Sequence, residues 1–141
     1  MASYTASFRN AMPRFVILRH EMPPSDGRGS HWDFMLEREG VLRTWAIDEL
    51  PSPGQTVTAQ ALPDHRLAYL DYEGPVSGNR GSVTCYDRGE YELLDETLER
   101  LRITLHGEKM DGRMVLTRAG ANDEWQIEFV SEKIQIQKDR G

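Results

Sequence analysis

Short segments in which apolar and polar residues alternate dominate this chain of 141 residues, and they constrain its fold more than any other feature. Alternation with a period of two places one face of a strand against a core and the other face against solvent. The clearest segments carry Leu101, Ile103 and Leu105, and then Trp125, Ile127 and Phe129. Frequent turn formers separate such segments. The pattern is therefore typical of a sheet built from many short strands.

Individual strands and turns follow from the same pattern. The continuous apolar run Phe15–Arg19 (FVILR) predicts a buried strand. Asp111-Gly112, between two alternating segments, predicts a hairpin turn. Two further strand pairs are predicted around the turns EG and GPVSGNRG, over Trp32–Arg38 and Val41–Ile47, and over Leu67–Glu73 and Ser82–Asp87.

Helical signals are scarce. The best candidate is Leu93–Leu101 (LLDETLERL), and one helical turn is expected around Pro63–Leu70. The predicted fold class is mainly β, a single compact β-barrel of short antiparallel strands with one or two short flanking helices. We expect residues 1–13 to form an N-terminal extension, residues 14–130 the barrel domain and residues 131–141 a polar C-terminal tail.

The charge distribution argues against a chain that wraps nucleic acid. Six arginines face five acidic residues over 1–45, whereas eleven basic and eighteen acidic residues occupy 46–141. Because duplex affinity rests on many Lys and Arg contacts to phosphates, a nucleic-acid ligand would be held by a few phosphates at one spot. A single cysteine, Cys85, and the lack of a long apolar run or signal segment predict a cytoplasmic protein without a membrane span.

Two histidines and an aspartate flank a Pro/Gly-rich loop, MPPSDGRGS. On a strand that begins at His31, the apolar residues share one face, while His31 and Asp33 share the other. His20 ends the preceding strand, and the loop can return the chain beside it. Two imidazoles and one carboxylate suit manganese, zinc or ferrous iron and leave positions open for water and substrate oxygens. The alternative is a pair of surface histidines beside a loop.

A second polar cluster lies in the segment PDHRLAY. His65 and Tyr69 are four residues apart, so both a strand and one helical turn place them on the same side. Together they can donate hydrogen bonds to a phosphoryl oxygen or protonate a leaving group. The structural alternative is a partly buried, hydrogen-bonded His–Tyr pair.

Several blocks, taken in order, resemble the 3′-phosphoesterase domain of bacterial DNA ligase D. They are FVILRHEM, HWDFMLEREGVLRTWAI and LPDHRLAYLDYEGPVSGNRGSVTCYDRGEYELL, followed by HGEKMDGRMVLTR and the tryptophan of DEWQI. The resemblance covers roughly Arg14 to Phe129. Its most specific elements are H…H-x-D-F-x-L-E, D-H-x-x-x-Y and G-x-V-x-x-Y/W-D-x-G.

This resemblance implies a β-barrel with a manganese-dependent site in a crescent groove. It implies removal of a terminal nucleoside and then of the remaining 3′-phosphate, which leaves a 3′-hydroxyl for ligation. Carried onto this chain, it implies that His20, His31 and Asp33 bind the metal, with acceptors that the sequence does not name fixing the other ring nitrogens. His65 and Tyr69 then contact the phosphate and the leaving-group side. The implied partners are 3′ ends of DNA or primer-template nucleic acid, and DNA repair polymerase and ligase proteins.

Two departures from the family pattern concern the site. The link between the two histidines is several residues longer, which costs little closure entropy. The family has an arginine two residues after the metal aspartate, where this chain has Met35, which cannot bind an oxyanion. Arg80, in the SGNRG turn, and Arg28, in the long loop, are candidates for holding the substrate phosphate instead.

Three functions are therefore compatible with the sequence. The main hypothesis is a metal-dependent 3′-phosphoesterase and phosphodiesterase that heals 3′ ends of DNA or RNA-tipped primers in repair, weakened by Met35. The alternative is a non-catalytic, metal-containing module that binds nucleic-acid ends or a repair partner. A phosphatase for small metabolites also fits, because the net charge of −6 gives no long nucleic-acid track.

Overall fold

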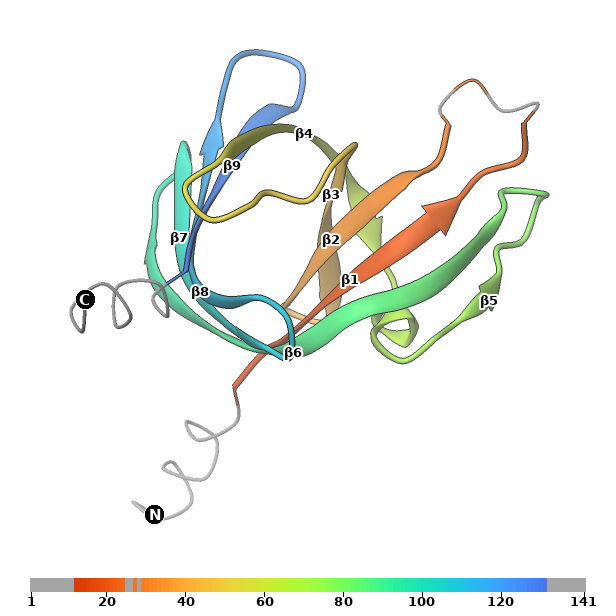
Figure 1. Cartoon of the computed structure of the whole chain (residues 1–141), viewed down its shortest axis with the longest axis horizontal. Helices are drawn as coiled ribbons and strands as arrows, with labels where there is room; N and C mark the ends of the chain where they lie inside the picture. The colour runs from red at the N-terminus through yellow and green to blue at the C-terminus, as the bar shows by residue number, and fades with distance from the viewer. Residues whose placement is uncertain (1–11, 25–26, 28, 132–141) are drawn as a thin grey trace, which may run out of the picture.

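Antiparallel strands account for most of the residues that the computed structural model describes, which are 12–24, 27 and 29–131, without the side chain of Ser131 (Figure 1). The predicted mainly β fold class is thereby confirmed. The elements are β1 (Arg14–Glu21), β2 (His31–Arg38), β3 (Val41–Ile47), β4 (Thr56–His65), the 3₁₀ helix η1 (Leu67–Leu70), β5 (Gly74–Pro75), β6 (Ser82–Glu96), β7 (Arg100–Gly107), β8 (Asp111–Arg118) and β9 (Glu124–Ser131).

The strands close into a barrel. Their order is β1-β2-β3-β4-β9-β8-β7-β6, and β6 pairs back with β1. Strand β6 closes the ring because it is 15 residues long, so its first part pairs with β1 and its second part with β7. The short β5 pairs with the start of β6, and Figure 1 shows it outside the barrel wall, beside β6.

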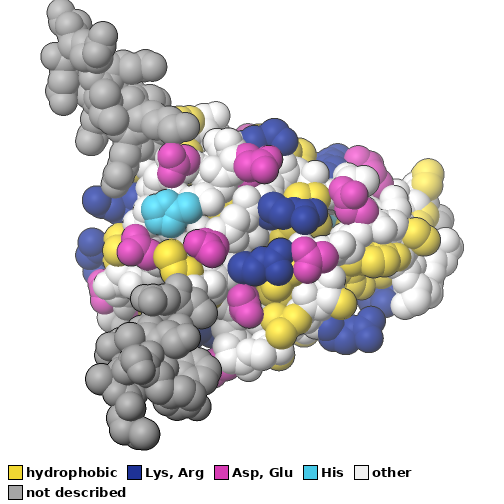
Figure 2. All heavy atoms as spheres, turned by 90° about the horizontal axis from the view of Figure 1, so that it is seen from below, with side chains coloured by type: hydrophobic (Ala, Val, Ile, Leu, Met, Phe, Trp, Pro, Cys, Tyr) yellow, Lys and Arg dark blue, Asp and Glu magenta, His cyan; other side chains and the backbone are white. Residues whose placement is uncertain are grey.

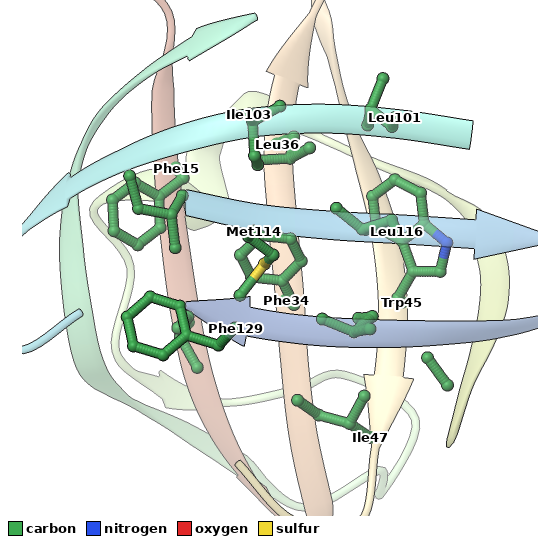
Figure 3. Packing of buried hydrophobic residues seen from close by; sticks show 14 of the residues in the cluster. Phe15, Phe34, Leu36, Trp45, Ile47, Leu101, Ile103, Met114, Leu116 and Phe129 are labelled. Carbon is green, nitrogen blue, oxygen red and sulfur yellow. The ribbon is translucent and has the colours of Figure 1, made fainter. Parts of the chain in front are cut away.

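The barrel interior is filled by large apolar side chains from almost every strand (Figure 3). Phe34 contacts Trp45 on the neighbouring strand, with ring centroids 6.1 Å apart. Trp45 in turn meets Trp125 of β9 edge-to-face at 5.6 Å, over β4, which lies between β3 and β9 in the sheet. Such aromatic contacts add about 0.5–1.5 kcal/mol each beyond the burial of their area.

A second apolar cluster lies on the outer face of the wall. Phe15 and Ile17 of β1 belong to the interior cluster, whereas Val16 and Leu18 belong to the outer one. Leu70 of η1 is among the residues that cover the outer face, together with Met35, Leu42, Val76 and Val83. Strand β1 is therefore buried on both faces, which confirms the prediction from its continuous apolar run.

The helix predicted over Leu93–Leu101 is wrong, because this segment forms the end of β6, a turn and the start of β7. Leu98 is 87% exposed at the turn, so the leucines of LLDETLERL do not make one buried stripe. Thr97 fixes the turn, since its hydroxyl accepts hydrogen bonds from the backbone N–H groups of Glu99 and Arg100. The described residues contain no α-helix, and none of their helical segments is long and apolar enough to cross a membrane.

Two other predictions need correction, and one strand was not predicted. The strand expected over Leu67–Glu73 is wrong; η1 lies there instead, in agreement with the helical turn expected around Pro63–Leu70. Strand β4 had no prediction. Asp111 and Gly112 open β8 and do not form the turn, which lies just before them.

Buried Asp87 explains the position of that turn. Its carboxylate accepts hydrogen bonds from the backbone N–H groups of Glu108, Lys109 and Met110, at 2.9, 3.2 and 2.8 Å. It also accepts one from the N–H of Arg88 at 2.9 Å. The carboxylate thus satisfies buried and partly buried backbone N–H groups of a turn that have no partner in the pairing of β7 with β8.

Asp87→Ala should therefore lower the free energy of unfolding by about 3 kcal/mol, because several buried donors lose a charged acceptor. Asp95→Ala is the matched control on the same strand. Asp95 makes only partly exposed ion pairs with Arg100 and Arg102, so its removal should cost less than about 1 kcal/mol. Urea unfolding of both variants measures the difference, and equal losses would show that Asp87 does not hold the turn.

Candidate metal centre

The register between β1 and β2 places two histidines side by side. His20 pairs directly with His31, and Leu18 pairs with Asp33. Since alternate residues share a face, His20, His31 and Asp33 all lie on the outer face of the barrel. The hydroxyl of Ser30 accepts a hydrogen bond from the N–H of Met22 at 2.9 Å, which closes the neck of the connecting loop. The extra loop length therefore leaves the register unchanged.

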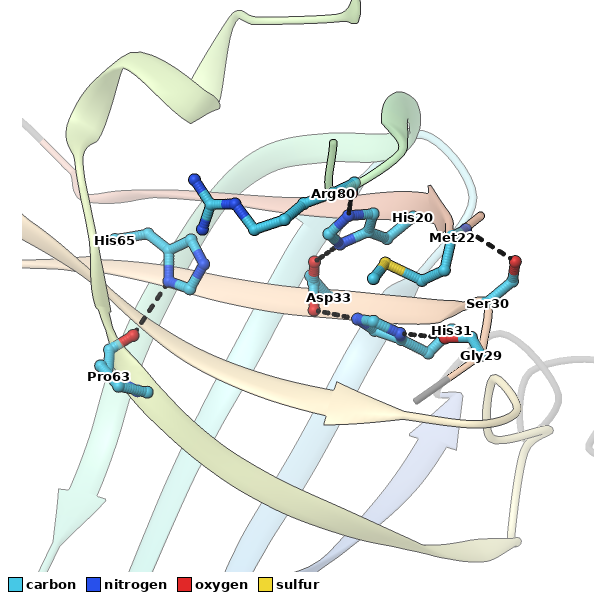
Figure 4. Close-up of polar contacts among 9 residues, drawn as sticks. All are labelled: His20, Met22, Gly29, Ser30, His31, Asp33, Pro63, His65 and Arg80. Carbon is cyan, nitrogen blue, oxygen red and sulfur yellow. Dashed lines mark hydrogen bonds and ion pairs between the residues drawn. The ribbon is translucent and has the colours of Figure 1, made fainter. Parts of the chain in front are cut away.

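The three side chains converge on one point (Figure 4). His20 Nδ1 lies 3.0 Å from Asp33 Oδ2, and His31 Nε2 lies 3.1 Å from Asp33 Oδ1. One ligand atom of each residue lies within 4.8 Å of the others. His31 and Asp33 are 3% and 2% exposed, so little water reaches their facing atoms.

Backbone carbonyls fix the far side of each imidazole. His31 Nδ1 lies 3.0 Å from the carbonyl oxygen of Gly29, and His20 Nε2 lies 2.8 Å from that of Arg80. A carbonyl only accepts, so both of these ring nitrogens carry a proton. In the neutral imidazoles, the nitrogens that face Asp33 then present lone pairs. These carbonyls are the acceptors that the sequence left unnamed.

Asp33 Oδ1 shows why this arrangement fits a metal ion. The atom is buried and accepts no hydrogen bond from the described residues, despite the approach of His31 Nε2. Two imidazole lone pairs and a carboxylate that face one another are stabilised by a cation between them. The donor set is nitrogen and oxygen, as in transition-metal sites with open positions.

The same geometry keeps Asp33 ionised. Burial alone raises the pKa of this carboxyl, but the hydrogen bonds and charges of His20 and His31 in their imidazolium forms, in which both ring nitrogens are donors, outweigh it. The pKa of Asp33 falls from 3.8 to about 2. The carboxylate is therefore available as a ligand throughout the neutral range.

A pocket of about 490 Å³ opens on this centre, and it also brings together the second predicted cluster. Its walls include His20, His31, Asp33, His65, Tyr69 and Arg80. The rings of His65 and Tyr69 meet edge-to-face with centroids 5.7 Å apart. His65 Nδ1 lies 2.9 Å from the carbonyl oxygen of Pro63, which orients the ring.

Arg80 reaches into this pocket from the turn before β6. Its Nε donates a hydrogen bond to the carbonyl oxygen of Ser77 at 2.7 Å, and Nη2 lies 3.3 Å from the Ser77 hydroxyl. Figure 4 shows its guanidinium extended toward His65. Gly81, with a φ of 79°, lets the turn lie against β1, because a Cβ there would stand 1.8 Å from the carbonyl oxygen of Glu21. Arg28 lies outside the described residues.

Met35 lies beneath the pocket. It shares its strand face with Asp33 and borders a small cavity of about 60 Å³ together with Asp33, His65 and Arg80. The side chain is 1% exposed and packs in the outer apolar cluster. It thus forms part of an apolar floor, while the arginine of the pocket comes from a different segment.

Sequence reasoning missed the parts of the site that act through the backbone. The carbonyls of Gly29, Pro63 and Arg80 orient the three histidines, and Ser77 holds Arg80. A carbonyl group is present at every position and has no signature in the sequence. Only Ser77, three residues before Arg80 in a glycine-containing turn, offered a signal.

Comparisons with known proteins identify the family to which the chain belongs. A family model described as DNA Ligase D 3′-phosphoesterase domain matches residues 24–118, a range that contains His31, Asp33, His65, Tyr69 and Arg80. The multifunctional non-homologous end joining protein LigD of Pseudomonas aeruginosa is 34% identical over 122 residues, covering 77% of this chain and 14% of the relative.

Two further relatives carry the same name. The protein of Mycobacterium bovis is 31% identical over 135 residues, covering 89% of this chain and 16% of the relative. That of Mycolicibacterium smegmatis is 32% identical over 119 residues, covering 73% and 15%. The chain spans only about a seventh of the length of these relatives. Since the family model matches more than half of the chain, this protein belongs to the DNA ligase D 3′-phosphoesterase domain family.

Proposed function

We propose that this protein is a metal-dependent 3′-phosphoesterase and phosphodiesterase that acts on 3′ ends of DNA or RNA-tipped primers. The observation that carries the proposal is the convergence of His20, His31 and Asp33 at one wall of a pocket that also contains Arg80, His65 and Tyr69. A centre that holds a cation thus faces groups that bind a phosphate.

His20, His31 and Asp33 are the residues that would hold the metal. When bound, a divalent ion supplies a Lewis acid for a phosphoryl oxygen and lowers the pKa of a bound water. The donor set suits manganese, zinc and ferrous iron alike, and the choice of manganese rests on the family resemblance.

The proposed reaction is a pair of hydrolyses. In the first, water adds to phosphorus and the bond to the 5′ oxygen of the terminal nucleoside breaks, which leaves a 3′-phosphate on the strand. In the second, water adds to that phosphate and the bond to the strand's 3′ oxygen breaks. The products are inorganic phosphate and a 3′-hydroxyl, the end that a ligase requires.

Arg80 is the residue we assign to the phosphate. Ser77 holds its Nε and Nη2, so the guanidinium is positioned before a substrate arrives. The side chain borders the pocket, and Figure 4 shows the guanidinium extended toward His65. A preorganised guanidinium of this kind stabilises the charge that develops on phosphoryl oxygens.

His65 and Tyr69 complete the phosphate contacts. Because His65 Nδ1 donates to the carbonyl of Pro63, Nε2 is left for the substrate. In the imidazolium form Nε2 donates to a phosphoryl or leaving oxygen, and in the neutral form it accepts a proton. The hydroxyl of Tyr69, on the same pocket wall, is a second donor.

This arrangement favours an enzyme over a non-catalytic module. Met35 cannot bind an oxyanion and would on its own favour the module, yet Arg80 brings a cation to the same pocket from another direction. On the face shown in Figure 2, basic and acidic side chains are interspersed and form no continuous basic track. The net charge of −6 for the whole chain likewise provides no long basic track, which supports the recognition of an end by a few phosphates.

The metal site predicts a specific loss of affinity. Asp33→Asn and His31→Ala should each weaken Mn²⁺ binding at least about 100-fold, because each removes a ligand and not only its support. Calorimetric titration of metal-free protein measures this, and repeating it with Zn²⁺ compares the two metals. His106→Ala, an exposed histidine of β7, is the control and should bind like the wild type. Unchanged affinity in the Asp33 and His31 variants would exclude the site.

His65→Ala should lower the phosphoesterase activity without changing the metal affinity or the stability of the fold. Removal of a 3′-phosphate from a 5′-labelled primer-template should fall by roughly 10²–10⁴. Mn²⁺ affinity and the urea midpoint should stay at wild-type values, because His65 is partly exposed and outside the metal set. A variant that unfolds would instead identify a structural His–Tyr pair.

Arg80 and Met35 give opposite predictions. Arg80→Ala should lower kcat/KM by roughly 10²–10³, the usual cost of a lost transition-state donor, while Arg100→Ala on the far hairpin serves as the control. Met35→Arg should not raise activity and should destabilise the protein, because it buries a charge in an apolar cluster. A Met35→Arg variant that is faster than the wild type would show that the phosphate lacks its arginine.

A further inference from the structure

A second hollow, of about 750 Å³, lies on the other side of His31. Its walls include Asp48, Thr58, Gln60, Asn122 and Glu124, and we call it the β4–β9 groove. His31 borders both the groove and the pocket described above. The metal centre therefore stands between two cavities, and the proposed phosphate contacts occupy only one of them.

The sheet register connects the groove directly to the centre. Asp33 pairs with Ala46 on β3, Ala46 with Gln60 on β4, and Gln60 with Glu124 on β9. These four residues form one row on the outer face, with neighbours about 4.8 Å apart along the row. Ala46 has the shortest side chain of the row, which leaves a hollow between the metal ligands and Gln60.

Among the described residues, the groove lacks the basic side chains that the pocket holds beside its carboxylates Asp33 and Asp64. Its named walls are two carboxylates, two amides and a hydroxyl, and no lysine or arginine among the described residues borders it. Arg66 and Arg80 border the pocket. The side chains of Thr58, Gln60 and Glu124 are exposed and make no hydrogen bond within the described part of the chain, so they are available to a ligand. A phosphate would be repelled here, whereas hydroxyl and amino donors would be bound.

We propose that the β4–β9 groove binds the terminal nucleoside that the phosphodiester step releases. This inference rests on the proposed function. A nucleoside carries sugar hydroxyls and base N–H groups but no charge, which matches the acceptors of the groove. The strand, with its remaining phosphates, then lies on the Arg66 and Arg80 side. His31 marks the boundary at which the scissile phosphate sits.

The two hydrolyses should depend on the groove differently. Release of a terminal nucleoside requires it, because the nucleoside is still attached and must be placed. Removal of a 3′-phosphate does not, because nothing then extends beyond the phosphorus. Substitutions in the groove should therefore separate two activities of one metal centre.

The kinetic test uses the double variant Gln60→Ala/Glu124→Ala in the full chain with Mn²⁺. For a primer-template with a 3′-terminal ribonucleoside, kcat/KM should fall at least about ten-fold, since two hydrogen bonds are lost. For the same primer ending in a 3′-phosphate, kcat/KM should stay within about two-fold. Glu128→Ala, on the same face of β9 beyond the groove, is the matched control for both substrates. Equal losses on the two substrates, or no loss on either, would overturn the assignment.

A binding test separates failure of this inference from failure of the proposed function. Free adenosine should shift the backbone amide resonances of Ala46, Gln60 and Glu124, and the double variant should weaken that binding. Inorganic phosphate should instead shift those of His65 and Arg80. If adenosine leaves the groove unshifted at millimolar concentration, the groove assignment is wrong even where 3′-phosphate removal is active. If adenosine binds the groove but neither substrate is cleaved, the nucleoside site stands and the enzymatic proposal fails.

Discussion

The pairing of β1 with β2 is the constraint on which the site depends. It sets His20 opposite His31 and places Asp33 two residues further on the same face. A shift of β2 by one residue in this register would send His31 and Asp33 into the barrel interior and leave His20 on the outer face. The register is secured from both sides, because the inner and outer faces of β1 are each packed by apolar residues. The relative positions of the three candidate metal ligands thus depend on the packing of both faces of β1.

The outer apolar cluster fixes the position of the segment between β4 and β6. Leu70 and Val76 pack on Val16 and Leu18, and this holds the segment that carries Tyr69 and Arg80 over the metal ligands. Asp71 adds a partly exposed ion pair with Arg14 at 2.8 Å. The groups that we propose bind the phosphate therefore come from an irregular segment that is fixed on a rigid wall, as binding residues on loops commonly are.

Much of the fold could be predicted from the sequence, because alternation reports directly which face of a strand is buried. Val41–Ile47 has the predicted bounds, and the barrel follows from the number of such strands. Prediction failed where tertiary contacts override local pattern. The leucines of LLDETLERL suggest a helix, but the Thr97 turn and the pairing of Tyr91 with Leu105 hold strands there. Asp87 likewise stabilises a turn at Glu108–Met110, just before the Asp111-Gly112 pair at which the sequence predicts it.

In the candidate site, too, the sequence predicts some groups and not others. His20, His31 and Asp33 were identifiable because their side chains carry the chemistry and strand parity brings them together. The orienting carbonyls of Gly29 and Arg80 were not, since their contribution depends on where the backbone passes. The role of the β4–β9 face also depends on register across four strands, which no local pattern in the sequence encodes.

Arg80 contacts both the candidate metal ligand His20 and the pocket that we propose binds the phosphate. Its carbonyl orients His20, while its side chain lies in the pocket, and Gly81 seats the same turn against the end of β1. Any displacement of this turn moves a metal ligand and a phosphate-binding group at once. Occupancy of the proposed metal and phosphate sites is then thermodynamically coupled through this turn: the factor by which metal changes the affinity for phosphate equals the factor by which phosphate changes the affinity for metal.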